Sequence, residues 1–460
     1  MSADGLRLAQ EKMRGAGVAD SAIDVFSHYY GLLESGATGL IAEDSIEPLL
    51  DPPALADVVV DPVQAREALA RTVLIKLNGG LGTSMGMDRA KSLLPVRADM
   101  SFLDVLVGQV RAAREAHDVP LPLILMNSFR TREQSLEALA AHPDIAVEGL
   151  PLDFLQNQEP KLRADDLTPV EWPADPTLEW CPPGHGDLYT AILSSGVLAA
   201  LLDLGYRYAS ISNADNLGAA PNATLAGWFA GSGAPYAAEL CRRTPADRKG
   251  GHLAIRRSDG RLILRDTAQT SPAEMHHFTD EHRHPYFHCN NLWFDLQALH
   301  AALVDRGAVL GLPLIRNTKT VDPTDPESPQ VVQVETAMGA AIEVFEGAQA
   351  IVVGRDRFLP VKTTDDLLLL RSDAYTHAPD GTLQRAAEPT PLVQLDPRFY
   401  RTMADFDARF PTGPPSLRSA TRLSVRGDWT FGGDVVVVGD VELADEGAPQ
   451  RIADGTTLGA

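Results

Sequence analysis

The sequence predicts an α/β fold, in which helices cover a mixed, mostly parallel β-sheet. Three observations support this prediction. Short apolar runs typical of buried strands alternate with longer segments of helical period between residues 71 and 380. Residues 1–70 space their apolar side chains like helices, and residues 381–460 carry short valine-rich runs. We therefore expect an N-terminal helical arm (1–70), a main domain (71–380) and a small C-terminal domain (381–460).

The arm is predicted from Ile23, Phe26, Tyr29 and Leu33, which recur three or four residues apart. In the main domain we expect strands near 73–77, 122–126 and 208–212, and helices over 102–116 and 187–204. Strands that alternate with helices favour a parallel sheet, whose ligands bind at the carboxyl ends of the strands.

Two later segments depart from this alternation. Residues 240–294 are predicted as an inserted antiparallel piece, with a hairpin over 253–264 that turns at Asp259-Gly260. Residues 423–443 form short valine-rich runs separated by Gly-Asp, a pattern that suggests a small β-helix.

Composition limits the possible functions. The 460 residues, 44% of them apolar, can bury a full core, and the net charge of −22 argues against binding to nucleic acid. Anionic ligands would then need local cations, for which Lys76, Lys91, Lys249 and Lys362 are the candidates.

Cys181, Cys241 and Cys289 show no metal-ligand spacing, so we expect reduced thiols and no zinc. The sequence has no signal-peptide pattern and no apolar run of membrane-spanning length, so we expect a cytoplasmic protein without a membrane partner.

The most informative segment follows the first expected strand, where Asn78-Gly79-Gly80-Leu-Gly82-Thr-Ser-Met-Gly86 leads to Lys91. Glycines allow positive φ and let backbone N–H groups approach phosphate oxygens, and a lysine can neutralise those oxygens. The P-loop pattern fails because four residues separate Gly86 from Lys91, and the dinucleotide pattern fails by one residue. Taken alone, this loop is also compatible with a strand-to-helix turn that merely tolerates glycine.

The wider sequence resolves this ambiguity. Residues 77–91 resemble the nucleotide-binding loop of eukaryotic-type UTP–glucose-1-phosphate uridylyltransferases, also called UDP-glucose pyrophosphorylases. Further similar blocks follow in family order up to Lys362, among them those around Met126-Asn127, Gln156, Pro182-Pro-Gly184-His185-Gly186-Asp187, Asn213-Ala-Asp215-Asn216, Lys249-Gly250-Gly251, Asn290-Asn291, Glu335 to Gly339 and Arg357-Phe-Leu-Pro-Val-Lys362. The resemblance implies a Rossmann-like nucleotidyltransferase core of GT-A-like type and a C-terminal domain often used in oligomer contacts. Because the chain ends at Ala460, sooner than the family pattern, a homo-oligomer is left open.

By this resemblance, UTP and glucose 1-phosphate are the substrates and the sugar phosphate attacks the α-phosphorus. Lys91 and Lys362 are the expected catalytic residues, Lys91 on the β- and γ-phosphates and Lys362 on the α-phosphate. The expected nucleotide-binding residues also include Leu77, Asn78, Gly79, Gly80, Met126, Gln156, Gly184 and Asp215.

The expected sugar-phosphate residues are His185, Asn213, Ala214, Asp215, Gly250, Asn290, Asn291 and Glu335. We interpret His185 as a binding residue, because a phosphate nucleophile needs no general base. Asn216, beside Asp215, is a further candidate for sugar or base contacts. Asp215 follows an apolar strand and offers a hard oxygen ligand, so Mg²⁺ is the expected cofactor.

Two departures from the family pattern bear on the substrate. Asp88-Arg89-Ala90 stand before Lys91 where a Gly-Pro is common, and Asp266 replaces a glutamate near the expected sugar site. Two alternatives therefore stay open: a uridylyltransferase for galactose 1-phosphate or N-acetylglucosamine 1-phosphate, and a non-catalytic paralogue that binds UDP-sugars.

Overall fold

A computed structural model describes residues 3–97, 100–244, 247–248, 250–378 and 381–459. Its centre is a seven-stranded sheet in the order β17-β11-β14-β10-β2-β5-β6. All neighbouring pairs are parallel except those of β14, which runs antiparallel to both β10 and β11. The strands are β2 (Thr72–Asn78), β5 (Leu123–Asn127), β6 (Asp153–Leu155), β10 (Tyr208–Asn213), β11 (Tyr236–Arg242), β14 (Tyr286–Asp295) and β17 (Gln349–Val352).

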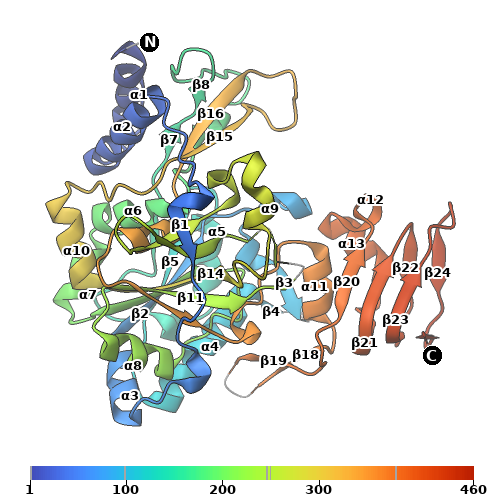
Figure 1. Ribbon diagram of the computed structural model, residues 1–460. Coiled ribbons are helices and arrows are strands. Elements are labelled where there is room, and N and C mark those ends of the chain that lie inside the picture. The colour runs from blue at the N-terminus through green and yellow to red at the C-terminus, as the bar shows by residue number, and fades with distance from the viewer. Residues whose placement is uncertain (1–2, 98–99, 245–246, 249, 379–380, 460) are drawn as a thin grey trace.

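Helices cover both faces of this sheet (Figure 1). Alternate residues of β2 point to opposite faces, so Val73 and Ile75 pack with one set of helices and Leu74 with the other. The first set is α2 (Asp20–Glu34), α6 (Leu188–Ser194), α7 (Val197–Asp203) and α10 (Leu296–Asp305), and the second is α3 (Pro62–Ala70), α4 (Phe102–His117), α5 (Arg132–Leu139) and α8 (Ala223–Ser232). The sheet is therefore buried on both sides, which explains its continuous apolar strands.

The predicted strands and helix 102–116 are confirmed to within two residues at each end. The predicted helix 187–204 is wrong as a single helix. It is divided into α6 and α7 at Ser195-Gly196, where Gly196 adopts a left-handed φ of 76°. The inserted antiparallel piece is also shorter than predicted. Its ends, β11 and β14, belong to the central sheet, and among its described strands β12 (His252–Arg256) and β13 (Leu262–Arg265) lie outside that sheet and form a hairpin.

The N-terminal arm begins with α1 (Ala3–Gly15) and α2, whose apolar sides join the main core. Residues 35–61 are not helical as a whole, because β1 (Ile46–Pro48) adds an edge strand to the β12–β13 hairpin. Both helices lie at the same end of the molecule as the small sheet of β8 (Leu162–Arg163), β15 (Ile315–Thr320) and β16 (Gln330–Glu335) (Figure 1). Other short elements complete the main domain: β3 (Pro95–Arg97), β4 (Met100–Ser101), β7 (Glu159–Pro160), β9 (Trp180–Cys181) and α9 (Met275–Phe278).

The C-terminal region forms a separate lobe beside the sheet (Figure 1). Its strands pair only in parallel, within a four-stranded sheet and a two-stranded sheet. They are β20 (Leu392–Leu395), β21 (Ser416–Val425), β22 (Trp429–Phe431), β23 (Val436–Leu443), β24 (Gln450–Ile452) and β25 (Thr457–Leu458), with α12 (Pro397–Tyr400) and α13 (Met403–Arg409) between them. The core of this lobe continues through α11 (Thr364–Arg371) to Met85, Ala214 and Leu217 of the main domain. The predicted boundary at residue 380 falls between β18 (Tyr375–His377) and β19 (Leu383–Arg385), which pair with each other.

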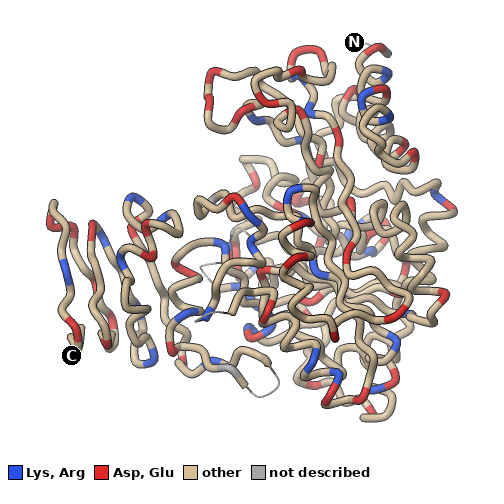
Figure 2. Tube along the Cα trace, turned by 180° about the vertical axis from the view of Figure 1, so that it is seen from behind, with Lys and Arg blue, Asp and Glu red and all other residues tan. Residues whose placement is uncertain are grey.

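Within the described residues, no single helix is long and apolar enough to cross a membrane, although the bent pair His185–Ser194 and Val197–Asp203 meets that test by length and composition together. Figure 2 shows acidic residues spread over both lobes of the molecule. Cys181, Cys241 and Cys289 are buried free thiols.

Candidate active site

A cavity of about 330 Å³ opens at the carboxyl ends of β2, β5 and β10. The register pairs Leu77 with both Asn213 and Met126, so the loops that leave these strands start at one level. The cavity is therefore at the edge where a parallel sheet binds ligands, as the sequence predicts. Its lining is Leu77, Asn78, Gly79, Gly80, Lys91, Ser92, Met126, Gln156, Pro182, Gly184, His185, Asn213, Ala214 and Asp215.

The glycine-rich loop lines this cavity with Gly79 and Gly80, but positive φ explains only one of its four glycines. Gly86 has φ 72°, whereas Gly79, Gly80 and Gly82 lie outside the left-handed region. At position 79 glycine is required for steric reasons instead, because a Cβ there would lie 2.6 Å from the Gln156 side-chain oxygen. The loop thus brings the bare backbone of residue 79 against Gln156, the residue expected to bind uracil.

Lys91 and Asp215 form an ion pair on the cavity wall. The loop folds back so that the Lys91 N–H donates to the Gly80 carbonyl at 3.3 Å, and the Lys91 Nζ lies 2.8 Å from Asp215 Oδ2. The two side chains are 17% and 20% exposed, so both can meet a ligand. Asn78 differs, since its side chain is buried and its amide nitrogen donates to Asn127 and Ser135 at 2.7 and 2.8 Å.

His185 is held by the backbone of a neighbouring turn. The Met338 N–H donates to His185 Nδ1 at 2.9 Å, so the neutral ring carries its proton on Nε2. His185 stays exposed, and the protein around its ring partly desolvates the imidazolium and lowers the pKa of His185. Gly184 has φ 79°, and a Cβ there would lie 2.6 Å from the Thr336 carbonyl oxygen. This close approach fixes the position from which His185 enters the cavity.

Several of the residues expected around the sugar do not line the cavity. Glu335 lies beside the cavity wall, with its Cβ 3.1 Å from the position of a Cβ on Gly184, and it accepts a hydrogen bond from Asn317 at 3.1 Å. Asn290 has a left-handed φ of 57° and lies 3.1 Å from His288 Nδ1. Gly250 accepts a hydrogen bond from Arg243. None of these three residues lines the cavity itself.

Asn291 and Asn216 are placed elsewhere. Both are buried, at 2% and 3% exposure, and they bond to each other through Asn216 Nδ2 and Asn291 Oδ1 at 3.0 Å. The structure therefore does not present Asn291 or Asn216 to the cavity, because each side chain is engaged inside the protein.

Lys362 lines a second cavity, of about 570 Å³, together with the rest of the segment 358–362. Its backbone is nonetheless close to the first cavity, because the Val361 N–H donates to the Asp215 carbonyl at 3.3 Å. The Lys362 backbone N–H donates to Asp366 at 2.8 Å, and within the described residues its ammonium group forms no hydrogen bond or ion pair. The catalytic role of Lys362 stays a prediction.

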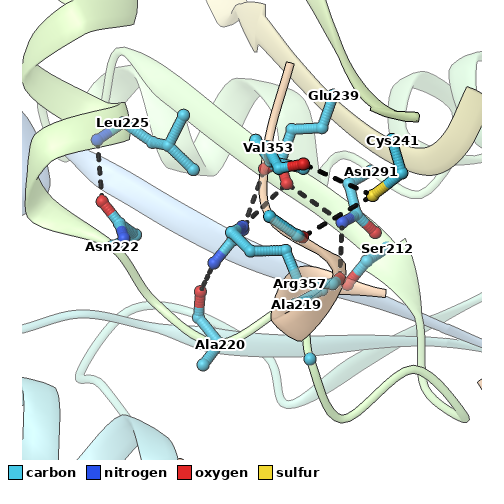
Figure 3. Close-up of polar contacts among 12 residues, drawn as sticks. Ser212, Ala219, Ala220, Asn222, Leu225, Glu239, Cys241, Asn291, Val353 and Arg357 are labelled. Carbon is cyan, nitrogen blue, oxygen red and sulfur yellow. Dashed lines mark hydrogen bonds and ion pairs between the residues drawn. The ribbon is translucent and has the colours of Figure 1, made fainter. Parts of the chain in front are cut away.

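A buried polar network beside the site was missed by the sequence analysis (Figure 3). Arg357 donates to both oxygens of Glu239 at 2.8 Å, and Trp293 and Asn291 complete the four hydrogen bonds that this carboxylate accepts. The sequence signals were that Arg357 begins one of the family-like blocks and that Asn291 lies in another, but neither pointed to Glu239.

Lys76 was expected to attract anionic substrates, and this expectation is wrong. Its side chain is buried and donates to Ser212 Oγ and the Ala219 carbonyl at 2.7 and 2.8 Å. Desolvation, with the nearby Arg357 charge, lowers the pKa of Lys76 to about 7. Lys249, another expected cation, lies outside the described residues.

Asp215 is the one lining residue that offers a carboxylate to a metal ion. Among the described residues, no group of three or more His, Cys, Asp or Glu side chains could hold a metal ion. Mg²⁺ can be held by a single protein carboxylate, because it takes its other ligands from substrate phosphates and water. The donor set therefore fits Mg²⁺ bound together with a nucleotide.

A cavity at the carboxyl edge of a parallel sheet, with a glycine-rich loop and a lysine beside a carboxylate, defines a phosphate-binding α/β enzyme. The family model described as UTP–glucose-1-phosphate uridylyltransferase matches residues 24–438. The chain belongs to this family.

Relatives and solved structures agree with this assignment. The chain is 36% identical to the UTP–glucose-1-phosphate uridylyltransferase of Solanum tuberosum, over 88% of this chain and 83% of that protein. It is 35% identical to the enzyme of the same name from Hordeum vulgare, over 99% and 95%. Its structure resembles that of a mutant UDP-glucose pyrophosphorylase from Leishmania major in complex with UDP-glucose, with a TM-score of 0.92, 38% identity and coverage of 99% and 98%.

Proposed function

We propose that this protein is a uridylyltransferase that forms UDP-glucose and pyrophosphate from UTP and glucose 1-phosphate. The observation that carries the proposal is the Lys91–Asp215 pair, which lines the same cavity as residues 77–80. Family membership supplies the identity of the substrates, and the pair supplies the charges that phosphate transfer needs.

The reaction is an in-line displacement at the α-phosphorus. A sugar-phosphate oxygen forms the new P–O bond, the bond to the β-phosphate oxygen breaks, and pyrophosphate leaves with the bonding electrons. The phosphate nucleophile is ionised at neutral pH, so the protein mainly orients the reactants and neutralises charge. In this proposal Lys91 binds the β- and γ-phosphates and stabilises the leaving pyrophosphate.

The walls of the cavity supply orientation. Gln156 can both donate to and accept from uracil, and Gly79 leaves room for that amide. His185 offers its Nε2–H to the sugar phosphate, with Glu335 and Asn290 near the sugar hydroxyls. Lys362 turns from the second cavity toward the α-phosphate, from the segment that is bonded to Asp215.

Mg²⁺ is the proposed cofactor, with Asp215 as its protein ligand. When bound, the ion neutralises phosphate charge and orients the phosphate oxygens. Asp215→Asn is expected to lower activity about 100-fold and to weaken Mg²⁺ binding in the presence of UTP, measured by calorimetry. An unchanged Mg²⁺ affinity would show that another group holds the ion.

Three finer points are also proposed. The sheet order and the parallel C-terminal strands support a GT-A-like core and a short β-helix. The buried free thiols are compatible with a reducing compartment, so we propose a cytoplasmic location, which fractionation of the source cells tests. A homo-oligomer is left to measurement by light scattering.

The direct test is pyrophosphate release from UTP and Mg²⁺ with glucose 1-phosphate, compared with galactose 1-phosphate and N-acetylglucosamine 1-phosphate. Release with glucose 1-phosphate at the highest kcat/KM supports the proposal. Faster release with another sugar phosphate would keep the mechanism and change the substrate. Absence of release with every sugar, together with measurable UDP-glucose binding, would favour a non-catalytic paralogue.

A further inference from the structure

The loop that carries Asp215 and the segment that carries Lys362 meet in the interior of the protein, and Asn216 lies at their junction. An isolated bridge pairs Asn216 with Pro360, and the Val361 N–H donates to the Asp215 carbonyl at 3.3 Å. The two proposed catalytic segments are thus adjacent along their backbones. Their relative position depends on what fixes this junction.

Asn216 uses all of its side-chain hydrogen-bonding capacity there. Its Oδ1 accepts the N–H of Leu359 at 2.8 Å and that of Gly218 at 3.2 Å. Its Nδ2 donates to Asn291 Oδ1 at 3.0 Å and to the Arg357 carbonyl at 3.2 Å. Because three of these partners are backbone groups of fixed polarity, the orientation of the amide is unambiguous.

The partners of Asn216 are themselves immobilised. Asn291 donates to the Arg357 carbonyl at 3.2 Å and to Glu239 at 3.0 Å, and the guanidinium of Arg357 forms two bonds of 2.8 Å to Glu239. Arg357 also donates to the Ala220 carbonyl at 2.8 Å, at the far end of the loop that starts at Asp215 (Figure 3). Every anchor of the junction therefore belongs to the central sheet or is bonded to it.

Gly218 gives independent evidence for a close junction. A Cβ at this position would lie 2.4 Å from the Asp356 carbonyl oxygen and 2.9 Å from the Phe358 backbone nitrogen. The two segments thus touch backbone to backbone, without a side chain between them. A residue other than glycine would push them apart.

We propose that Asn216 is a positioning residue that sets Lys362 relative to Asp215 for the transfer step. Asn216 does not touch substrate in this role, since its side chain is buried and fully bonded within the protein. The inference rests on the catalytic role given to Lys362 under the proposed function. It adds that the Asn216 side-chain amide aligns this lysine.

The test is a double-mutant cycle with Asn216→Ala and Lys362→Ala, measured as kcat and as KM for UTP. Asn216→Ala is expected to lower kcat about 10- to 100-fold and to change KM less than about threefold. In the Lys362→Ala background the same substitution should lower kcat by about threefold or less, because the group that it aligns is gone. A merely structural role would give the same loss in both backgrounds.

Asn127→Ala is the matched control. Asn127 is also fully buried, and its side chain bonds to Asn78 and Asp153 at 2.7 and 3.1 Å, neither of which belongs to the 354–362 segment. Its effect on kcat should be the same with and without Lys362. If Asn216→Ala does not fold, Gly218→Ala disturbs the same junction by steric contact alone and should show the same dependence on Lys362.

The outcomes separate the two proposals. A large loss on Lys362→Ala with equal losses from Asn216→Ala in both backgrounds overturns this inference and leaves the proposed function intact. Wild-type turnover by Lys362→Ala removes Lys362 from the proposed mechanism, and the positioning role with it. Reduced loss in the Lys362→Ala background, with additive behaviour of the Asn127 control, supports the inference.

Discussion

Asn216 neighbours two ion pairs that differ in how completely they are bonded, one through its bond to the Arg357 carbonyl and one through Asp215, which precedes it. Arg357 and Glu239 are 6% and 0% exposed, and all four hydrogen bonds of the carboxylate are made within the protein. Lys91 and Asp215 are 17% and 20% exposed, and a single contact of 2.8 Å joins them. The first pair has no capacity left for a ligand, whereas the second can exchange its partner for a phosphate or a metal ion.

This difference indicates how the site separates stability from function. A buried pair costs desolvation but fixes the segments around it when its geometry is complete. A partly exposed pair joined by one contact contributes less to folding, because water reaches it and weakens the attraction between its charges. We call Lys91–Asp215 the open pair and Arg357–Glu239 the buried pair. Substitution in the open pair should therefore change catalysis, and substitution in the buried pair should change stability.

The largest expected effect is on catalysis, from Lys91→Ala. Loss of the ammonium removes the charge proposed to stabilise the leaving pyrophosphate, and kcat should fall about 1000-fold. The free energy of unfolding should change by less than about 1 kcal/mol. Pyrophosphate release and urea unfolding measure the two effects.

Lys12→Ala is the matched control for this prediction. Lys12 also pairs with a carboxylate, Glu179, at similar exposures of 21% and 15%, but it lies in the N-terminal arm away from the cavity. Its kcat should stay within about twofold of wild type. Activity of Lys91→Ala close to that of Lys12→Ala would show that the open pair has no catalytic role.

The buried pair should show the opposite behaviour. Glu239→Gln keeps the shape of the side chain but leaves the Arg357 charge uncompensated, so the free energy of unfolding should fall by about 3 to 5 kcal/mol. Glu442→Gln is the control, because Glu442 pairs with Arg422 and Arg426 at 47% exposure and should cost less than about 1 kcal/mol. Similar losses from both variants would contradict the distinction between buried and open pairs.

A third carboxylate sharpens the comparison, because it is buried without a cation. Asp187 is 5% exposed and accepts hydrogen bonds from the Asn157 N–H and Nδ2 at 2.6 and 2.7 Å. Desolvation raises the pKa of Asp187 from 3.8 to about 6, although both hydrogen bonds oppose the shift. For Glu239 burial also favours the neutral acid, but the Arg357 charge outweighs it and lowers the pKa.

The sign of the pH effect follows from that difference. Because the folded protein holds the Asp187 proton more tightly than the unfolded chain, folding loses about 3 kcal/mol from this group as pH rises from 4 to above 6. Asp187→Asn should remove this loss, so its stability relative to wild type should increase by about that amount over this range. Urea unfolding of both proteins at several pH values measures it, and a constant difference would show that the pKa of Asp187 is not raised.

The strands and the site edge could be predicted from the sequence, because their causes are local. Val73 to Leu77 form a β-branched, apolar run, and polar residues follow it at the carboxyl end. The break between α6 and α7 was missed because the apolar spacing continues across Gly196, and only its left-handed φ ends the helix.

The directions of the polar side chains could not be predicted. Lys76 lies one residue from Leu77 of the cavity, yet strand alternation turns it into the interior toward Ser212. Asn213 and Asn216 are equally polar in the sequence, but only Asn213 lines the cavity, because Asn216 meets the chain again at Leu359. That contact joins residues 143 positions apart, a separation that no local pattern contains.

The smallest expected effect comes from a substitution at Gly79, in the glycine-rich loop that lines the cavity. Gly79→Ala places a Cβ 2.6 Å from the Gln156 side-chain oxygen, so the amide must move from the position in which it is proposed to bind uracil. We expect KM for UTP to rise about tenfold while kcat changes less than about threefold, because binding is lost equally in the ground and transition states. Steady-state kinetics with varied UTP measure both constants.

Gly80→Ala separates this contact from a general stiffening of the loop, because a Cβ at residue 80 meets no atom within 4 Å. Its KM for UTP should rise less than that of Gly79→Ala. In a Gln156→Ala background the clash partner is absent, so Gly79→Ala should then have little further effect on KM. If Gly79→Ala raises KM for UTP equally with and without Gln156, residue 79 contacts the nucleotide directly and the Gln156 amide does not cause the rise.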